Sequence, residues 1–260
     1  MIENLTGPGQ SIFSGPAVLP SPVKIVRVHL ELLKMRMAEL GIANIGMCYL
    51  RPQERERFHS FRYEKRRIEW LAGRIAAKCA GLQLQNNDEK ICWGKKQWQQ
   101  LQIAADISGR PFILWSIQES NIPAHISISH SRGYAIAMAA WDKCGVDIQQ
   151  VTPAVERVEV RFVSAGEKNL LAEIVSLHGS QAALTLLWSA KEAVKKTCGS
   201  ADLPGFQDIR LQSLQMSGAA YVFRVQVKAH EQGQKLTQFV RLRLLDGYAY
   251  AVTIRNNEIT

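Results

Sequence analysis

The sequence predicts a mixed α/β (α+β) protein of two halves, each with a helix followed by strands. Apolar residues recur at helical spacing from about residue 52 and again over residues 181–197. Short runs that alternate between apolar and polar residues follow each helical stretch, as expected for strands. Turn-forming residues over 142–145 separate the two series. We expect an irregular lead-in over residues 1–22, a first half over residues 23–142 and a second half over residues 143–260.

The first half opens with an apolar alternation. Residues 23–32 predict a strand, although the pattern from His29 onward also fits the start of a helix. From Pro52 the spacing turns helical, with basic residues interleaved among aromatic and aliphatic ones. Residues 101–117 predict strands around a Ser-Gly-Arg-Pro turn, and residues 125–130 predict a further strand.

The join between the halves lies in a predicted β-hairpin. Residues 134–141 form an apolar run of strand length, and residues 146–149 form a second short run. The turn chemistry between them indicates that the two strands pair. Because side chains alternate along a strand, Asp147 and Gln149 are expected on the same face.

The second half continues with two helices and a series of strands. The helices are predicted over residues 167–177 and 181–197, and Gly199 follows at the position of a C-terminal cap. Four alternating runs after Pro204 predict strands over residues 209–214, 221–227, 239–245 and 248–254. No sequence repeat is evident.

The composition favours a globular intracellular protein. Of the 260 residues, 47% are hydrophobic and 21% charged, which indicates a packed core rather than disorder. The five cysteines are spread along the chain without a CxxC pair, so neither a disulfide framework nor a zinc cluster is expected. No basic-then-apolar leader opens the chain and no apolar run approaches the ~18 residues of a membrane span. We expect a cytoplasmic protein without a membrane partner.

The net charge of +9 favours an anionic partner. Arg67, Arg74 and Lys78 share one face of the predicted helix, because they are spaced by seven and four residues. Two interpretations stay open: a solvated basic face, or a cradle for phosphates. A nucleic-acid-binding protein would also explain the charge, but no recognised nucleic-acid module appears, so we expect no such partner.

A second group of charges lies on the helix predicted over residues 181–197. Trp188, Glu192 and Lys196 are spaced by fours and share one face. One interpretation is a core tryptophan beside an exposed ion pair. The apolar run before them indicates a core-packed helix, where charged groups need a functional or structural reason. Lys191 and Lys195 lie on an adjacent face and are predicted to be solvated.

Two further segments carry candidate polar groups. Asp147 lies in a half-buried strand, where it either closes the hairpin by hydrogen bonding or supplies a carboxylate to a site. Carboxylates beside a cation are what a Mg²⁺-assisted attack on a phosphate requires. His130 is either a satisfied loop residue or, with Ser129, a contact for a phosphate. The usual hydrolase, NTPase and dinucleotide loops are absent from the sequence.

Six short segments in one order resemble the 4′-phosphopantetheinyl transferase superfamily, of the Sfp and enterobactin-synthetase type. They are residues 65–74 (KRRIEWLAGR), 109–111 (GRP), 128–131 (ISHS), 145–148 (GVDI), 161–164 (RFVS) with Glu167, and 188–192 (WSAKE) with Lys196. The resemblance implies two similar α/β halves in a pseudo-twofold arrangement, and the join inferred near residue 143 agrees with it. Because both halves lie in one chain, a monomer is sufficient, and we expect one.

The resemblance implies roles for individual residues. Asp147 and Glu192 look like two Mg²⁺ ligands, and Lys196 looks like the lysine that touches the reacting phosphate. Many members have a glutamate where this chain has Gln149, which stays a candidate ligand that contributes no charge. The implied contacts to coenzyme A phosphates are Arg57, Arg66, Arg74, Arg110, Ser129 and His130.

The implied reaction transfers 4′-phosphopantetheine from coenzyme A to a serine of an apo acyl or peptidyl carrier protein, with release of adenosine 3′,5′-bisphosphate. Lys196 would stabilise charge on the transferred group, and Glu192 or a bound water would accept the serine proton. A coenzyme A-binding relative that has lost activity is an alternative, suggested by Gln149 alone. Fatty-acid, polyketide and peptide-synthetase carriers are all compatible with the sequence.

Overall fold

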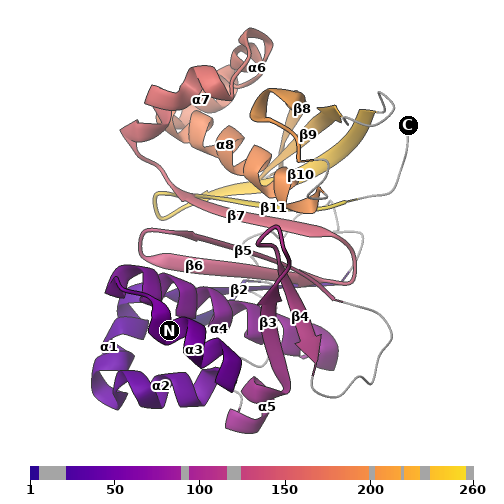
Figure 1. The fold of residues 1–260 in the computed structure, drawn as a ribbon. Helices are drawn as coiled ribbons and strands as arrows, with labels where there is room; N and C mark the ends of the chain where they lie inside the picture. Colours follow the sequence, from indigo (N-terminus) through magenta and orange to yellow (C-terminus); the bar gives the residue numbers. More distant parts are fainter. Residues whose placement is uncertain are drawn as a thin grey trace. The chain divides into compact units, whose positions relative to one another are not determined.

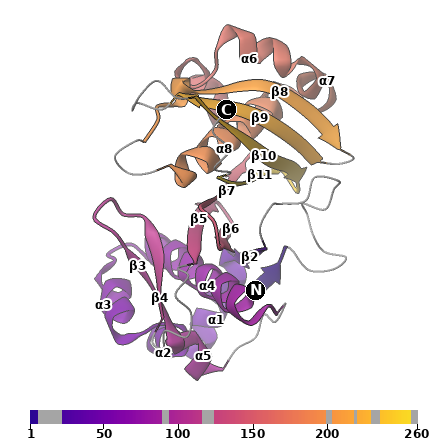
Figure 2. The same cartoon turned by 90° about the vertical axis from the view of Figure 1, so that its right-hand side faces the viewer.

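The computed structural model divides the chain into two compact units (Figures 1 and 2). It describes residues 1–5, 22–88, 94–115, 124–198, 203–217, 220–228 and 235–255. The described part of the first unit ends at Asp142, and that of the second unit begins at Lys143. Each unit has its own hydrophobic core.

The first unit is an antiparallel sheet packed against a long helix. Its strands run in the order β1-β2-β6-β5-β4-β3. They are β1 (Ile2–Asn4), β2 (Val23–His29), β3 (Leu101–Ala105), β4 (Pro111–Trp115), β5 (His125–Ser131) and β6 (Tyr134–Ala140). The helices are α1 (Leu30–Leu40), α2 (Ile42–Tyr49), α3 (Pro52–Ser60), α4 (Glu64–Asn86) and α5 (Lys95–Gln100).

Helix α4 packs on β2, β3, β5 and β6, and it carries much of the core of the first unit. Leu71 and Ile75 are fully buried in it, next to the small side chains of Ala72 and Ala76. Small residues on a helix let its backbone lie close to a sheet, while the larger ones fill the space between strands. The buried side chains of α4 thus form one continuous core with the apolar face of the sheet.

The second unit has a similar internal build. Its antiparallel strands run in the order β7-β11-β10-β9-β8, and helix α8 (Ser180–Thr197) packs on one face (Figure 2). The strands are β7 (Cys144–Gln150), β8 (Ile209–Ser217), β9 (Ala220–Lys228), β10 (Lys235–Leu245) and β11 (Tyr248–Ile254). The remaining helices are α6 (Ala165–Leu170), α7 (Ala172–His178) and the 3₁₀ helices η1 (Pro153–Arg161) and η2 (Phe206–Asp208).

The predicted fold class is confirmed: helices pack on antiparallel sheets, in an α+β protein. The predicted hairpin between residues 134–141 and 146–149 is wrong. Strand β6 is hydrogen-bonded on both edges, to β2 and β5, so it has no free edge for β7. Strand β7 pairs instead with β11, which lies about a hundred residues later in the chain (Asp147 opposite Ala251). The pseudo-twofold arrangement of the halves stays a prediction.

Several element boundaries differ from those predicted. The first long strand ends at His29 and a helix begins at Leu30, which decides between the two interpretations of that segment. The lead-in is not irregular throughout, because Ile2–Asn4 pairs with β2, while residues 6–21 and Gly199 lie outside the described residues. The helical stretches from Pro52 and over residues 167–177 are each split in two. Within the described ranges, no helix combines the length and the apolar character needed to cross a membrane.

Candidate functional site

The contact between α8 and β7 places Asp147 beside a helix face. Asp147 lies in the middle of β7 and is 5% exposed. A Cβ on Gly145, two residues earlier, would overlap the carbonyl oxygen of Ala193 in α8. Only glycine therefore allows this close approach of the helix backbone to the strand. The approach brings the polar side chains at the end of α8 to the strand that carries Asp147.

Lys196 bridges the helix and the strand. Its Nζ donates to the carbonyl oxygen of Val146 (2.8 Å) and to Oδ1 of Asp147 (2.9 Å). The ion pair is partly shielded, since the Lys196 side chain is 25% exposed and that of Asp147 is 7% exposed. Lys196 thus forms its ion pair with a carboxylate on another element, and not the exposed pair with Glu192 that was one interpretation of the sequence.

Glu192 lies one helical turn before Lys196 and is partly buried. Burial raises the pKa of its carboxyl group, and the negative charge of Asp147 raises this pKa further. The cations of Lys196 and Lys195 act in the opposite direction. The two carboxylates are therefore close enough to interact electrostatically, although they belong to segments more than forty residues apart.

The donor set fits a hard divalent cation. Asp147 and Glu192 offer carboxylate oxygens, and Gln149 is a partly buried amide in the same strand as Asp147. In the described part of the chain, no three His, Cys, Asp or Glu side chains gather as a complete metal site. Mg²⁺ does not require one, because it is commonly held by one or two carboxylates, water and substrate phosphates. A cation placed here would relieve the repulsion that raises the pKa of Glu192.

Two of the predicted phosphate contacts meet in the first unit. Nη1 of Arg66, in α4, lies 3.4 Å from Nε2 of His130 at the end of β5, and both residues are exposed. Ser129 is buried and, as the neighbour of His130 in a strand, points to the opposite face of the sheet. The structure therefore brings Arg66 and His130 together but separates Ser129 from them.

A second basic group lies further along α4. The guanidinium carbon of Arg74 lies 4.8 Å from the centre of the Trp70 ring, which is a cation–π distance. Burial lowers the pKa of Arg74 to about 10, Glu54 opposes this, and the like charge of Arg57 adds to it. Arg57 is exposed in α3, and Arg110 lies in the loop between β3 and β4 with intermediate exposure.

The prediction that Lys191 is solvated is wrong, and Lys78 fits neither interpretation of the basic face of α4. Lys78, expected on the basic face of α4, is fully buried and forms an ion pair with Glu54 at 2.5 Å. Lys191 in α8 is also fully buried and forms an ion pair with Glu167 at 2.8 Å. The sequence held a signal for both, since each lysine stands among alanines and other small or apolar residues that pack into a core.

Comparison with known proteins places the chain in a family. A family model for the 4′-phosphopantetheinyl transferase superfamily matches residues 143–253. Three bacterial proteins named holo-[acyl-carrier-protein] synthase are similar to the chain. That of Staphylococcus haemolyticus is 32% identical over 95 residues, which is 36% of this chain and 73% of the relative. That of Staphylococcus carnosus is 33% identical over 95 residues, 36% of this chain and 74% of the relative.

The third relative, from Halalkalibacterium halodurans, is 33% identical over 79 residues, which is 30% of this chain and 61% of the relative. The chain thus spans less than two thirds of that relative's length. The family model covers the segments that carry Asp147, Glu192 and Lys196. On these matches, the chain belongs to the 4′-phosphopantetheinyl transferase superfamily.

Proposed function

We propose that the protein transfers 4′-phosphopantetheine from coenzyme A to a serine hydroxyl of an apo carrier protein. The observation that carries the proposal is the ion pair between Lys196 of α8 and Asp147 of β7. Glu192 lies one helical turn before Lys196, and its pKa is raised by burial and then by the charge of Asp147. The family match and the names of the relatives support it. The products would be the modified carrier and adenosine 3′,5′-bisphosphate.

Asp147 and Glu192 would hold Mg²⁺, with Gln149 as a neutral third ligand. When bound, this ion would neutralise charge on the diphosphate of coenzyme A and polarise it toward attack. Lys196 reaches the same position from α8 and would stabilise negative charge on the transferred phosphate. Its ammonium is held by the Val146 carbonyl, so its position is fixed before substrate binds.

The proton of the carrier serine needs an acceptor. Glu192 is the candidate, because burial and Asp147 raise its pKa toward the range in which a carboxylate accepts a proton effectively. A carboxylate that ligates a cation is a weaker base, so a water held by Glu192 is the second candidate. Either way, the half-buried position of Glu192 limits the solvent around it.

The first unit would contribute contacts to the phosphates of coenzyme A. Arg66 and His130 form the best-supported pair, because both are exposed and their side chains meet. Arg57 and Arg74 form a second group whose charges repel each other, and a bound phosphate would offset that repulsion. Arg110 would add a further cation. Ser129 is the weakest of the predicted contacts, because it faces the other side of the sheet from His130.

The partner would be an acyl or peptidyl carrier protein. The names of the relatives favour an acyl carrier. The net charge of +9 suits both the anionic coenzyme A and an acidic carrier protein. We also propose that the protein acts as a monomer, because the one chain carries all the candidate residues. We propose the cytoplasm as its location.

The proposal is tested by incubating the protein with Mg²⁺, coenzyme A and an apo acyl carrier protein, followed by intact-mass measurement of the carrier. The expected result is a mass increase equal to one 4′-phosphopantetheinyl group. The control carrier has its acceptor serine replaced by alanine and should not change. Binding of coenzyme A without any mass shift would instead support the non-catalytic alternative, and affinity for DNA or RNA alone would support a nucleic-acid-binding role.

A further inference from the structure

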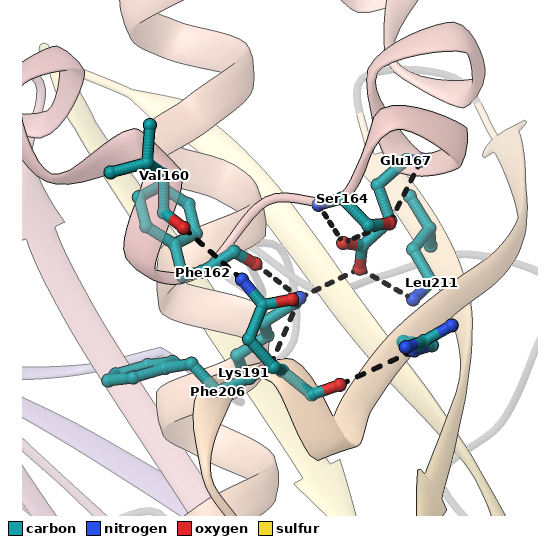
Figure 3. Close-up of polar contacts among 9 residues, drawn as sticks. Val160, Phe162, Ser164, Glu167, Lys191, Phe206 and Leu211 are labelled. Carbon is teal, nitrogen blue, oxygen red and sulfur yellow. Dashed lines mark hydrogen bonds and ion pairs between the residues drawn. The ribbon is translucent and has the colours of Figure 1, made fainter.

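Lys191 in α8 joins several segments of the second unit through polar contacts (Figure 3). Its Nζ lies 2.8 Å from Oε1 of Glu167 in α6 and donates to the carbonyl oxygens of Phe162 and Phe206. The Glu167 carboxylate accepts the N–H of Leu211 in β8 and that of the N-cap residue of α6. We call this set of contacts the Lys191–Glu167 clamp.

The same set of contacts occurs in the first unit around Lys78 of α4. Its Nζ lies 2.5 Å from Oε2 of Glu54 in α3, and it donates to the carbonyl oxygens of Tyr49 and Trp98. The Glu54 carboxylate accepts the N–H of Ile103 in β3 and that of the N-cap residue of α3. The two charged side chains are 0% and 2% exposed, the same values as in the second unit.

The numbering shows that the two clamps are one arrangement used twice. The lysines and the glutamates are each separated by 113 positions (191 − 78 and 167 − 54). The N-cap residues have the same separation (164 − 51). The contact residues that follow each lysine in the sequence are separated by 108 positions. They are Leu211 and Ile103 (211 − 103), and Phe206 and Trp98 (206 − 98). An internal repeat that the sequence pattern does not reveal is therefore visible in the polar contacts.

The charged residues of the candidate site are not repeated in the helices. The separation of 113 positions aligns Glu192 with Cys79 (192 − 113) and Lys196 with Gln83 (196 − 113). Cys79 and Gln83 are both buried in α4 and carry no charge comparable to those of α8. The first unit thus keeps the clamp without the acid and the cation that follow it in the second unit.

The strand register shows that Asp147, too, has no charged counterpart in the first unit. Asp147 pairs with Ala251, the fourth residue of β11, and Val26 pairs with Ala137, the fourth residue of β6. Val26 therefore occupies the position of Asp147 in the first unit, and its side chain is fully buried. The two units offer a matched pair. One clamp lies on the helix that carries Glu192 and Lys196, and the other lies on α4, which carries the proposed coenzyme A contacts Arg66 and Arg74 but no counterpart of Glu192 or Lys196.

We propose that Lys191, held by Glu167, is a positioning residue that fixes the rotation of α8 so that Glu192 and Lys196 face Asp147. This inference rests on the proposed function. Successive side chains of a helix point about 100° apart, so anchoring Lys191 determines the direction of the next side chain, that of Glu192. The contacts reach α6, η2 and β8 as well as the end of η1, and they oppose both turning and sliding of the helix.

Stability alone does not account for an ion pair at this position. Burial lowers the pKa of Lys191, and the hydrogen bond and charge of Glu167 oppose that effect. Buried ion pairs of this kind are often no more stabilising than apolar residues of the same volume. Apolar contacts, however, have no directional preference and leave the rotation of a helix less well defined. A directional network is what the placement of catalytic side chains requires.

The test compares Lys191→Met with the matched variant Lys78→Met, using intact-mass transfer assays and thermal unfolding. Both changes leave a buried glutamate without its cation, and both should lower the unfolding midpoint by a similar amount, roughly 10 °C. Only Lys191→Met should lower kcat, by at least about tenfold, and raise the Mg²⁺ concentration that gives half the maximal rate. Lys78→Met should keep the wild-type kcat and Mg²⁺ dependence.

A second pair of variants separates turnover from stability. Lys191→Met combined with Glu167→Gln, and Lys78→Met combined with Glu54→Gln, remove the unpaired carboxylate and should recover part of the lost stability. The kcat of the first double variant should stay low, because the directional contacts of Lys191 are still missing. If the single variants do not fold, the two double variants are compared with each other, and the kcat of the Lys191→Met/Glu167→Gln variant should be the lower one.

Three outcomes would overturn the inference. Equal effects on kcat at the two clamps would show that both act through stability alone. Recovery of wild-type kcat in the Lys191→Met/Glu167→Gln variant would show that the unpaired charge, and not the lost positioning, lowered the rate. Failure of the wild-type protein to transfer phosphopantetheine would overturn the proposed function and this inference with it, whereas the first two outcomes leave the proposed function intact.

Discussion

The ammonium of Lys196 lies 2.9 Å from the Asp147 carboxylate, and this ion pair joins the last turn of α8 to the middle of β7. Burial raises the pKa of Glu192, one turn earlier in the same helix, and the charge of the same aspartate raises it further. A cation from the helix thus contacts an acid from the strand, with a second acid one turn away on the helix, an arrangement suited to binding Mg²⁺ beside a diphosphate.

Removal of either carboxylate should abolish transfer without unfolding the protein. We expect Asp147→Asn and Glu192→Gln each to lower kcat by at least about 10²-fold, because each removes a charge from the proposed Mg²⁺ ligands. Transfer rates and circular dichroism measure the two effects. Asp142→Asn and Glu173→Gln, at exposed positions, serve as controls and should keep wild-type rates. Full activity in either site variant would refute its role as a metal ligand.

Lys196→Met should lower turnover more than affinity for coenzyme A. The reason is that its charge is expected to interact most strongly with the phosphate in the transition state, and the loss should be about 10²-fold in kcat. Steady-state kinetics with coenzyme A as the varied substrate separates kcat from KM. The control is Lys143→Met, at an exposed position of the second unit, which should keep the wild-type kcat and KM. An unchanged kcat with a raised KM would assign Lys196 to substrate binding instead.

Gly145→Ala should damage both stability and activity. The added methyl group overlaps the Ala193 carbonyl oxygen, so α8 must move away from β7. We expect a loss of about 1–3 kcal/mol in the free energy of unfolding, with a fall in kcat as Lys196 moves away from Asp147. Gly166→Ala is the control, because nothing lies within 4 Å of its added Cβ. It should raise stability by up to about 1 kcal/mol and leave kcat unchanged. Wild-type stability of Gly145→Ala would contradict the close approach.

Arg66→Gln and His130→Gln should each raise the KM for coenzyme A by about tenfold, with little change in kcat, since each removes a contact to a substrate phosphate. The two side chains meet, so the double variant should show less than the summed effect. Isothermal titration with coenzyme A gives the affinities. The exposed Arg62→Gln is the matched control. If Arg66→Gln, His130→Gln and the double variant all bind coenzyme A as tightly as the wild-type protein, the phosphate contacts lie elsewhere.

The elements of this fold could be read from the sequence where the pattern is long and regular. The periodicity over residues 181–197 predicted a helix, and α8 occupies Ser180–Thr197. The partner of β7 could not be predicted, because a short turn favours a local hairpin while the true partner, β11, lies about a hundred residues later. Periodicity describes which face of a strand is apolar, but it does not identify the neighbouring strand.

The motifs named the candidate site residues, whose roles stay predictions, but they did not reveal the buried ion pairs that support the helices. Spacing placed Glu192 and Lys196 on one helix face. In the structure Lys196 contacts Asp147, and the charge of Asp147 adds to the effect of burial on the pKa of Glu192. The burial of Lys78 and Lys191 was missed, because a lysine is ordinarily exposed and its buried partner lies far away in the sequence. A lysine within a run of small and apolar residues, preceded by a glutamate in a helix-capping position, is the signal that could have identified each clamp.

The central claim is that Asp147 and Glu192 hold one divalent cation between them. It is tested most directly by titrating the wild-type protein with Mn²⁺, as a paramagnetic substitute for Mg²⁺, in the presence of coenzyme A. We predict one Mn²⁺ per chain in the wild-type protein, strong weakening of that binding in both Asp147→Asn and Glu192→Gln, and competition by Mg²⁺. Wild-type Mn²⁺ affinity in either variant would contradict the claim.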